Sequence, residues 1–442
     1  MSKTSDDIKE FRKVLRNSDR PLQTSDAFYV PNLHGTQAED VVQRLFDDIE
    51  ETSATGLYYF TGQRGTGKST ELLRLQMMLD GAAKRCILLE SLNYLNDTQN
   101  ITAEMLMLVV AAGVNDWIAA TYPSVDFGKE PLFERFKNWL KTEVGLEKIE
   151  ASTGPVKFTI NLKPTQPSVQ EKIENLNSRQ RFHQQLIEFI SQMCGWVQQR
   201  ESRNVVVVVD SLERLRGSAF AVVGQDDIYR QVAEVFSDQL ELLKVPNLKL
   251  VYSVPPYLGL LQNVRTQVSV YALASVRVYE HPNIGKRTPR AEGLDHMRAL
   301  LSKRWPNWGL IFSSSAVDAL ALLSGGDLRQ FVLRILIDAL VQAEYAIERL
   351  PLAATDPIIG KIRAGCVSEM LQLTVRDEWP LLSSVAKDNN PIAQNKNQLK
   401  TLAHLLEVKV ILNYRNGSDW FDLHPTLWPT IDAFDKSSDK VA

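Results

Sequence analysis

The sequence predicts an α/β fold with a five-stranded, mostly parallel sheet, followed by an all-helical lid and a C-terminal winged-helix domain. Three observations support this fold. Apolar runs of strand length alternate with helical segments from residue 56 onward, as in parallel sheets with helical crossovers. Residues 291–350 have helical spacing without a convincing strand. Near the C-terminus, helices precede two short strands joined by Asn416-Gly417, a strong hairpin-turn signal.

The chain has 442 residues, which suggests about two to four domains. With 44% hydrophobic and 23% charged residues, it has the composition of a soluble globular protein. The net charge of −3 excludes a uniformly basic nucleic-acid binder. Three cysteines lie far apart in the sequence, so neither a zinc site nor a disulfide framework is expected.

The N-terminus is charged, without an apolar leader, and no run of about 18 apolar residues is apparent. We therefore expect a cytoplasmic protein without membrane association. Residues 1–55 are predicted to form an N-terminal segment with a helix, and residues 56–290 the core, with an insertion at about 122–180. Residues 291–360 are predicted to form the lid and residues 361–442 the tail.

The strand candidates of the core are residues 57–62, 86–91, 205–210, 248–254 and 276–280. Each is rich in apolar or β-branched residues and is bounded by polar or turn residues. The insertion is harder to assign, because residues 157–164 resemble part of a hairpin whereas residues 178–200 return to helical spacing.

A glycine-rich motif, GQRGTGKST, follows the first strand and precedes a helical stretch. It fits the Walker A pattern G-x-x-x-x-G-K-[ST] without a mismatch, and residues 62–69 are called the Walker A loop below. In such loops main-chain N–H groups and a helix N-terminus surround the phosphates, the lysine neutralises them, and the hydroxyl holds Mg²⁺. The predicted cofactor-binding residues are Gly62, Gln63, Arg64, Gly65, Thr66, Gly67, Lys68, Ser69 and Thr70. A glycine-rich turn without a ligand is the alternative.

Five consecutive valines precede Asp210, as in a central strand covered on both sides. The carboxyl ends of parallel strands face the ligand crevice, so Asp210 is predicted to hold through water the Mg²⁺ that the Ser69 hydroxyl also holds. Glu213 is predicted to orient or deprotonate the attacking water. A helix N-cap is the alternative role of Asp210.

The sequence resembles the AAA+ ATPases and their signalling relatives, the STAND NTPases. Asp210-Ser211-Leu212-Glu213 matches the STAND pattern of an aspartate, a small residue, an apolar residue and an acid. The resemblance implies that Ser253 is a polar sensor near the γ-phosphate and that Arg329 reaches this phosphate from the lid. An exposed arginine in a helix capped by an aspartate is the alternative for Arg329.

The resemblance also implies an arginine finger that completes the site of a neighbouring subunit. Arg265 is in the usual position, although an ordinary surface arginine fits equally well, and the rival candidates are Arg277, Arg287 and Arg290. Tyr29 lies in a segment that resembles the one flanking adenine in these families, which implies ATP rather than GTP. His424 is in the position of the STAND histidine that contacts the β-phosphate of ADP; a half-buried structural histidine is the alternative.

Three functions remain open. The first is a prokaryotic ATPase switch that forms homo-oligomers and relays a signal to a separate effector, an output that the resemblance connects with defence against phage. The second is an AAA+ ATPase that acts on DNA through the winged helix, with Lys396, Lys400, Lys409 and Arg415 supplying charge. In the third, bound ATP is a structural ligand and is not hydrolysed.

Overall fold

The computed structural model describes residues 3–52, 54–95, 101–127, 129–144, 176–212, 225–391 and 396–438. These residues form two compact units. The sheet unit comprises Val42–Thr61 and Arg74–Tyr271. The loop-and-lid unit comprises Met1–Val41, Gly62–Leu73 and Ala272–Ala442, so it contains the Walker A loop, the lid and the tail. The finer division into four segments stays a prediction.

The sheet has the strand order β2-β3-β4-β1-β5. Strands β2 and β3, β3 and β4, and β4 and β1 pair in parallel, which confirms the predicted α/β fold and its five-stranded, mostly parallel sheet. All residues of β1 and of β4 are buried, as expected for central strands covered on both faces. The strands are β1 (Gly56–Gly62), β2 (Lys84–Glu90), β3 (Asn204–Asp210), β4 (Lys249–Val254) and β5 (Ser269–Leu273).

The prediction placed the fifth strand at residues 276–280, which was wrong. Strand β5 lies earlier in the chain, and the Val276 N–H instead donates to the Gly326 carbonyl in the lid at 3.1 Å. The segment SVYALASVRVYE contains two short apolar stretches with strand-like composition. Periodicity alone cannot decide which of them finds a partner in the sheet.

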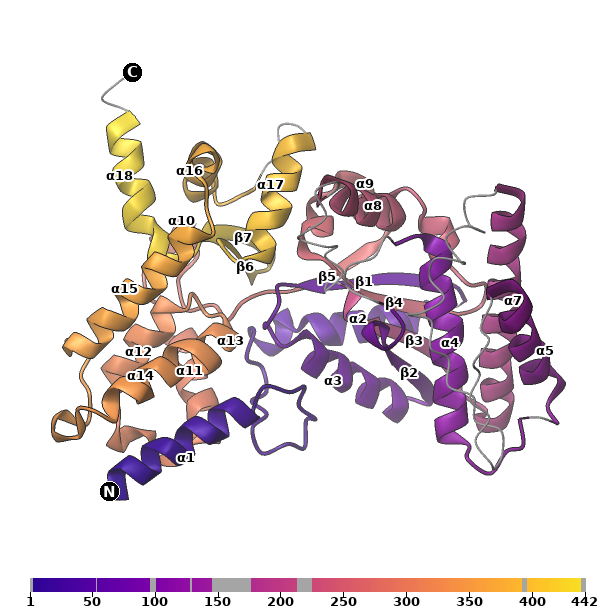
Figure 1. Cartoon of the computed structure of the whole chain (residues 1–442), viewed down its shortest axis with the longest axis horizontal. Coiled ribbons are helices and arrows are strands. Elements are labelled where there is room, and N and C mark those ends of the chain that lie inside the picture. Colours follow the sequence, from indigo (N-terminus) through magenta and orange to yellow (C-terminus); the bar gives the residue numbers. More distant parts are fainter. Residues whose placement is uncertain are drawn as a thin grey trace. The chain divides into compact units, whose positions relative to one another are not determined.

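Helices surround the sheet (Figure 1). Helix α4 packs against α7 and against β2. It is long and apolar enough to cross a membrane, but 78% of its apolar window is buried inside the protein, as in the core helix of a folded domain. The predicted hairpin at residues 157–164 lies outside the described residues. The helices are α2 (Val41–Glu51), α3 (Lys68–Gly81), α4 (Ala103–Thr121), α5 (Pro131–Trp139), α7 (Leu176–Glu201), α8 (Gln225–Ser237) and α9 (Gln262–Gln267).

The lid consists of helices and turns, without a strand in residues 291–360, all of which the structure describes. Helix α1 (Lys3–Asn17) joins it (Figure 1). Ile8, Phe11 and Leu15 are fully buried in the same apolar core as the lid helices. The helices of this core are α11 (Ala291–Arg304), α12 (Ser314–Leu323), α13 (Leu328–Gln330), which continues through a π-helical turn (Phe331–Ile335) into α14 (Leu336–Ala343), and α15 (Pro357–Gln372).

The tail contains α16 (Trp379–Asp388), α17 (Lys396–Glu407), the antiparallel strands β6 (Ile411–Asn416) and β7 (Ser418–Leu423), and α18 (Trp428–Ser438). The helices followed by a hairpin agree with the sequence. The turn is tighter than expected, because Asn416 pairs with Ser418 and only Gly417 has a positive φ, of 82°. Whether this tail acts as a winged helix stays a prediction.

Candidate functional site

The Walker A loop connects β1 to α3 and depends on two glycines. Gly65 and Gly67 have φ values of 88° and 95°, a region that side chains other than glycine rarely adopt. Lys68 begins α3, and its ammonium donates to the carbonyls of Gly62 at 2.8 Å and Gln63 at 3.2 Å. The lysine is 4% exposed. Its charge is therefore held against the loop backbone.

Replacing Gly65 by alanine is expected to damage the loop more than replacing Gly67. Both substitutions place a Cβ on left-handed backbone, but a Cβ on Gly65 would lie 2.6 Å from the Cβ of Arg329, whereas the nearest atom to one on Gly67 is 3.8 Å away. The Arg329 Cβ is fixed to the lid backbone and cannot rotate aside. We expect Gly65→Ala to lower the unfolding temperature more than Gly67→Ala in calorimetry. Equal decreases would contradict this close packing.

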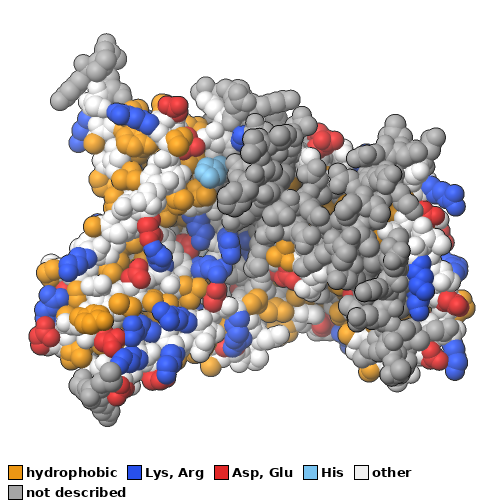
Figure 2. Space-filling view, in the orientation of Figure 1, with side chains coloured by type: hydrophobic (Ala, Val, Ile, Leu, Met, Phe, Trp, Pro, Cys, Tyr) orange, Lys and Arg blue, Asp and Glu red, His pale blue; other side chains and the backbone are white. Residues whose placement is uncertain are grey.

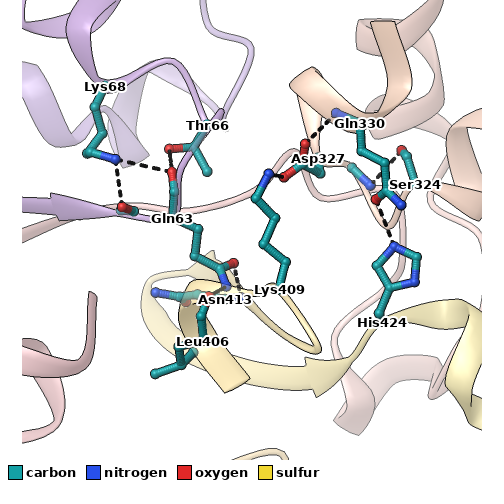
Figure 3. Close-up of polar contacts among 12 residues, drawn as sticks. Gln63, Thr66, Lys68, Ser324, Asp327, Gln330, Leu406, Lys409, Asn413 and His424 are labelled. Atoms are coloured by element: carbon teal, nitrogen blue, oxygen red, sulfur yellow. Dashed lines mark hydrogen bonds and ion pairs between the residues drawn. The ribbon is translucent and has the colours of Figure 1, made fainter. Parts of the chain in front are cut away.

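Gln63 connects the Walker A loop to the tail (Figure 3). Its side-chain amide donates to the carbonyls of Leu406 at 2.8 Å and Ile411 at 2.6 Å, and its oxygen accepts the N–H of Asn413 at 3.1 Å. Gln63 is 2% exposed. In addition, the Gln63 carbonyl accepts the Thr66 hydroxyl at 2.9 Å. One residue thus ties the loop conformation to α17 and β6.

A second connection brings lid and tail charges to the same loop (Figure 3). Asp327, which is fully buried, accepts the Gln330 N–H at 2.6 Å through one carboxylate oxygen. Its other oxygen forms an ion pair with Lys409 of the tail. Arg329 instead pairs with Asp19 at 2.7 Å. Asp327 therefore caps the helix, as the alternative expected, while Arg329 lies beside the Walker A loop, as the sensor role requires. The sensor role of Arg329 stays a prediction.

His424 of the tail is fully buried. Its ring nitrogens lie 2.8 Å from the Thr426 hydroxyl and 2.8 Å from the Gln330 side-chain oxygen. In this conformation the imidazole links the tail to Gln330 of the lid. Its predicted contact with the β-phosphate stays a prediction. The pKa of His424 is lowered to about 4, mainly by burial; the charge of Asp327 opposes this shift and that of Lys409 adds to it.

The pKa of His424 predicts a pH-dependent stability. Below pH 6.5 the unfolded chain protonates this histidine while the folded chain does not, so acid favours unfolding until about pH 4. We expect the stabilising effect of His424, relative to a His424→Gln variant, to be about 2 kcal/mol smaller at pH 5 than at pH 7.5. Denaturant titrations at both pH values measure it. The comparison cancels the opposite contribution of Asp422, whose pKa burial raises to about 6. A pH-independent difference would contradict the prediction.

The N-terminal segment also contacts the start of α3. The Leu22 N–H donates to the Thr70 hydroxyl at 3.1 Å. His34 lies 2.9 Å from the Ala274 carbonyl through Nδ1, and its Nε2 is 3.8 Å from the Cβ position of Gly67. Tyr29, which lies between Leu22 and His34 in the sequence, is half-buried. The segment that contains Tyr29 is thus held near the start of α3. That it flanks adenine stays a prediction.

The carboxyl edge of the sheet carries three polar residues on neighbouring strands. Asp210 ends β3 and is 5% exposed, and Glu90 ends β2 in register with it. Ser253 of β4 is fully buried and in register with Phe60 of β1. Ser211, which has a positive φ of 68°, donates its hydroxyl to Glu90 at 3.0 Å. Glu213 lies outside the described residues.

The candidate arginine fingers have different surroundings. Arg265 is exposed on α9, and its Nε donates to the Gly259 carbonyl. Arg277 donates to the Arg415 carbonyl at 3.1 Å. Arg287 forms two bonds to Asp432, at 2.9 and 2.8 Å, and Arg290 pairs with Glu280 at 3.3 Å. Among the four candidates, Arg265 is therefore the one best placed to meet another molecule. Its role as an arginine finger stays a prediction.

Sequence reasoning missed Glu90 at the sheet edge and His34 beside the Walker A loop, and it did not connect Lys409 with this loop. An acid at the end of a buried strand is a signal that Glu90 shares with Asp210, so it could have been found. The sequence around His34 and Lys409 carries no local signal of a ligand site, and only the fold brings them to the loop glycines. Lys409 was instead assigned to a DNA-binding face.

No protein-family model matches the chain, and no curated protein matches it. Among solved structures, it is similar to a Walker-type ATPase of Pyrococcus abyssi, with 13% identity, a TM-score of 0.37 and coverage of 92% of this chain and 100% of that chain. It is also similar to Cdc6p from Pyrobaculum aerophilum, with 13% identity, a TM-score of 0.34 and coverage of 94% and 99%. For the Aeropyrum pernix ORC2 protein in ADPNP–ADP complexes the identity is 9%, the TM-score 0.34 and the coverage 93% and 97%. At these values the likeness carries no assignment of function.

Proposed function

We propose that this protein is an ATP-binding and ATP-hydrolysing switch of the AAA+/STAND type, in which nucleotide at the Walker A loop controls the tail. The observation that carries the proposal is the set of three hydrogen bonds from the Gln63 side chain to the tail. A nucleotide that rearranges the loop backbone must move Gln63 or stretch these bonds. The tail is therefore the element that responds to the nucleotide.

The chain offers the groups that Mg-ATP requires. Lys68 would exchange its two loop carbonyls for phosphate oxygens when the nucleotide binds. The Ser69 hydroxyl is an oxygen ligand of the kind that Mg²⁺ takes, and the Asp210 carboxylate would hold the ion through water. The ion would neutralise charge on the transferring phosphoryl group. Ser253 and Glu213 are proposed to act on the γ-phosphate and on the attacking water.

Calorimetric titration with Mg-ATP and measurement of phosphate release test this proposal. We expect binding of ATP and ADP, and turnover that a Glu213→Gln substitution abolishes while binding persists. An absence of heat at millimolar nucleotide would contradict the nucleotide site. Binding without turnover, with any partner, would favour the structural role of ATP.

We further propose that the ATP-bound protein forms homo-oligomers and relays its state to a separate effector in the cytoplasm. Arg265 is the proposed finger toward a neighbouring subunit, because it is exposed on α9. The connection with anti-phage defence rests on the sequence resemblance alone. Light scattering with and without ATP measures assembly. An Arg265→Ala protein that assembles normally but has lost turnover would support the finger, whereas unchanged turnover would reject it.

Action on DNA is the second candidate, and the two helices followed by a hairpin in the tail favour it. The charges favour it less, because Lys409 pairs with Asp327 and Arg415 pairs with Asp419. On the face shown in Figure 2, the described Lys and Arg side chains lie among Asp, Glu and apolar ones. Duplex binding that weakens steeply with salt would support this candidate over the signalling switch.

A further inference from the structure

Lys409 has a backbone conformation that lysine seldom adopts. It follows α17, has a φ of 63°, and donates its N–H to the Leu406 carbonyl at 3.3 Å. Glycine or asparagine usually occupies this left-handed position after a helix. Residues held in a sparsely populated backbone region cluster at active sites, ligand clamps and switch regions. The backbone conformation therefore marks the side chain of Lys409 as a candidate functional group.

The Lys409 ammonium is held between a buried acid and the Walker A loop (Figure 3). It pairs with Asp327, whose side chain is fully buried, while the Lys409 side chain is 16% exposed. The same ammonium lies 3.3 Å from the Cβ position of Gly65. A cation of the tail thus lies beside a glycine whose role in a Walker A loop is to let backbone approach phosphate.

We propose that Lys409 is the phosphate-binding residue of the tail, specific for nucleoside di- and triphosphates. This inference rests on the proposed nucleotide site. A phosphate group in the loop competes with Asp327 for the ammonium, since both are anions that accept charge-assisted hydrogen bonds. When Lys409 turns to the phosphate, Asp327 keeps its bond to the Gln330 N–H and loses its partner in the tail. The contact between lid and tail thereby depends on the nucleotide.

Two substitutions with opposite expected effects test the competition. Asp327→Asn preserves an oxygen for the Gln330 N–H but removes the competing charge, so the affinity for ADP and ATP should increase severalfold. Asp327→Asn combined with Lys409→Met removes both charges without leaving a buried ion unpaired, and the affinity should fall about tenfold or more below that of the unmodified protein. A purely structural pair would lower the affinity in both proteins.

Isothermal titration with AMP, ADP and ATP in the presence of Mg²⁺ measures these affinities. We expect the affinity for AMP to change less than that for ADP or ATP, and Lys409→Arg to retain most of the affinity. Lys361→Met, at an exposed position on α15, is the matched control and should leave every affinity unchanged. Thermal unfolding without nucleotide identifies any variant that has lost its fold.

The two hypotheses fail in different ways. No binding of any nucleotide by the unmodified protein would contradict the proposed function and, with it, the role of Lys409. Normal binding by the unmodified protein, together with equal ATP affinity in the doubly substituted protein, would overturn the role of Lys409 alone. A decrease in ATP affinity on Asp327→Asn would contradict the competition between carboxylate and phosphate.

Discussion

A Lys68→Ala protein is expected to bind Mg-ATP about 100-fold more weakly, or not measurably, while keeping its fold. The ammonium of Lys68 now contacts the carbonyls of Gly62 and Gln63. We expect it to contact two phosphate oxygens when ATP binds, and hydrogen bonds that involve charged groups contribute about 1.5–3 kcal/mol each. Two such contacts account for at least a 100-fold change in affinity. Calorimetric titration at constant ionic strength measures it.

The fold of this variant should survive, because the Gln63 carbonyl keeps the Thr66 hydroxyl as a partner at 2.9 Å. Lys361→Met, on the exposed side of α15, controls for the loss of one positive charge. A Lys68→Ala protein that binds ATP within threefold of the unmodified protein would show that the nucleotide, if bound, lies elsewhere.

The second large effect is expected for Gln63→Leu, which should lower the free energy of unfolding by about 3 kcal/mol. The substitution keeps the approximate volume of the side chain but removes three hydrogen bonds to the tail. The Leu406 carbonyl retains the Lys409 N–H at 3.3 Å. The buried Ile411 carbonyl and Asn413 N–H lose their Gln63 partners, and a buried group without a partner costs about 1–3 kcal/mol.

Denaturant titration measures this loss, and Arg64→Ala provides a control in the same loop. Arg64 is exposed, so its substitution should change stability by about 0.5 kcal/mol or less. The tail of the Gln63→Leu protein should also become more sensitive to limited proteolysis than that of the control. Equal stability of the two variants would show that Gln63 does not hold the tail.

The sequence was sufficient to predict the parts of the fold that depend on local pattern. Continuous apolar runs predicted β1 and β3, and the Walker A motif predicted a turn between β1 and α3, because these signals lie within short segments. The fifth strand was misplaced because two adjacent segments have similar composition and only pairing with β1 distinguishes them.

The site depended more on long-range contacts. Gln63 occupies a variable position of its motif, yet its side chain reaches residues that are more than 340 positions away, at Leu406 and Ile411. Lys409 looked like a surface charge, because its partner Asp327 belongs to another segment of the chain. Such pairings arise from tertiary packing, which periodicity and propensity do not encode.

The Walker A loop belongs to a unit assembled from three separated stretches, the last of which ends at Ala442. The sheet unit ends at Tyr271. Because domains fold as the ribosome delivers them, from the N-terminus onward, we expect the sheet to form on the nascent chain while the loop still waits for its partners in the tail. Nucleotide would then bind only after the tail has been synthesised and has joined the loop.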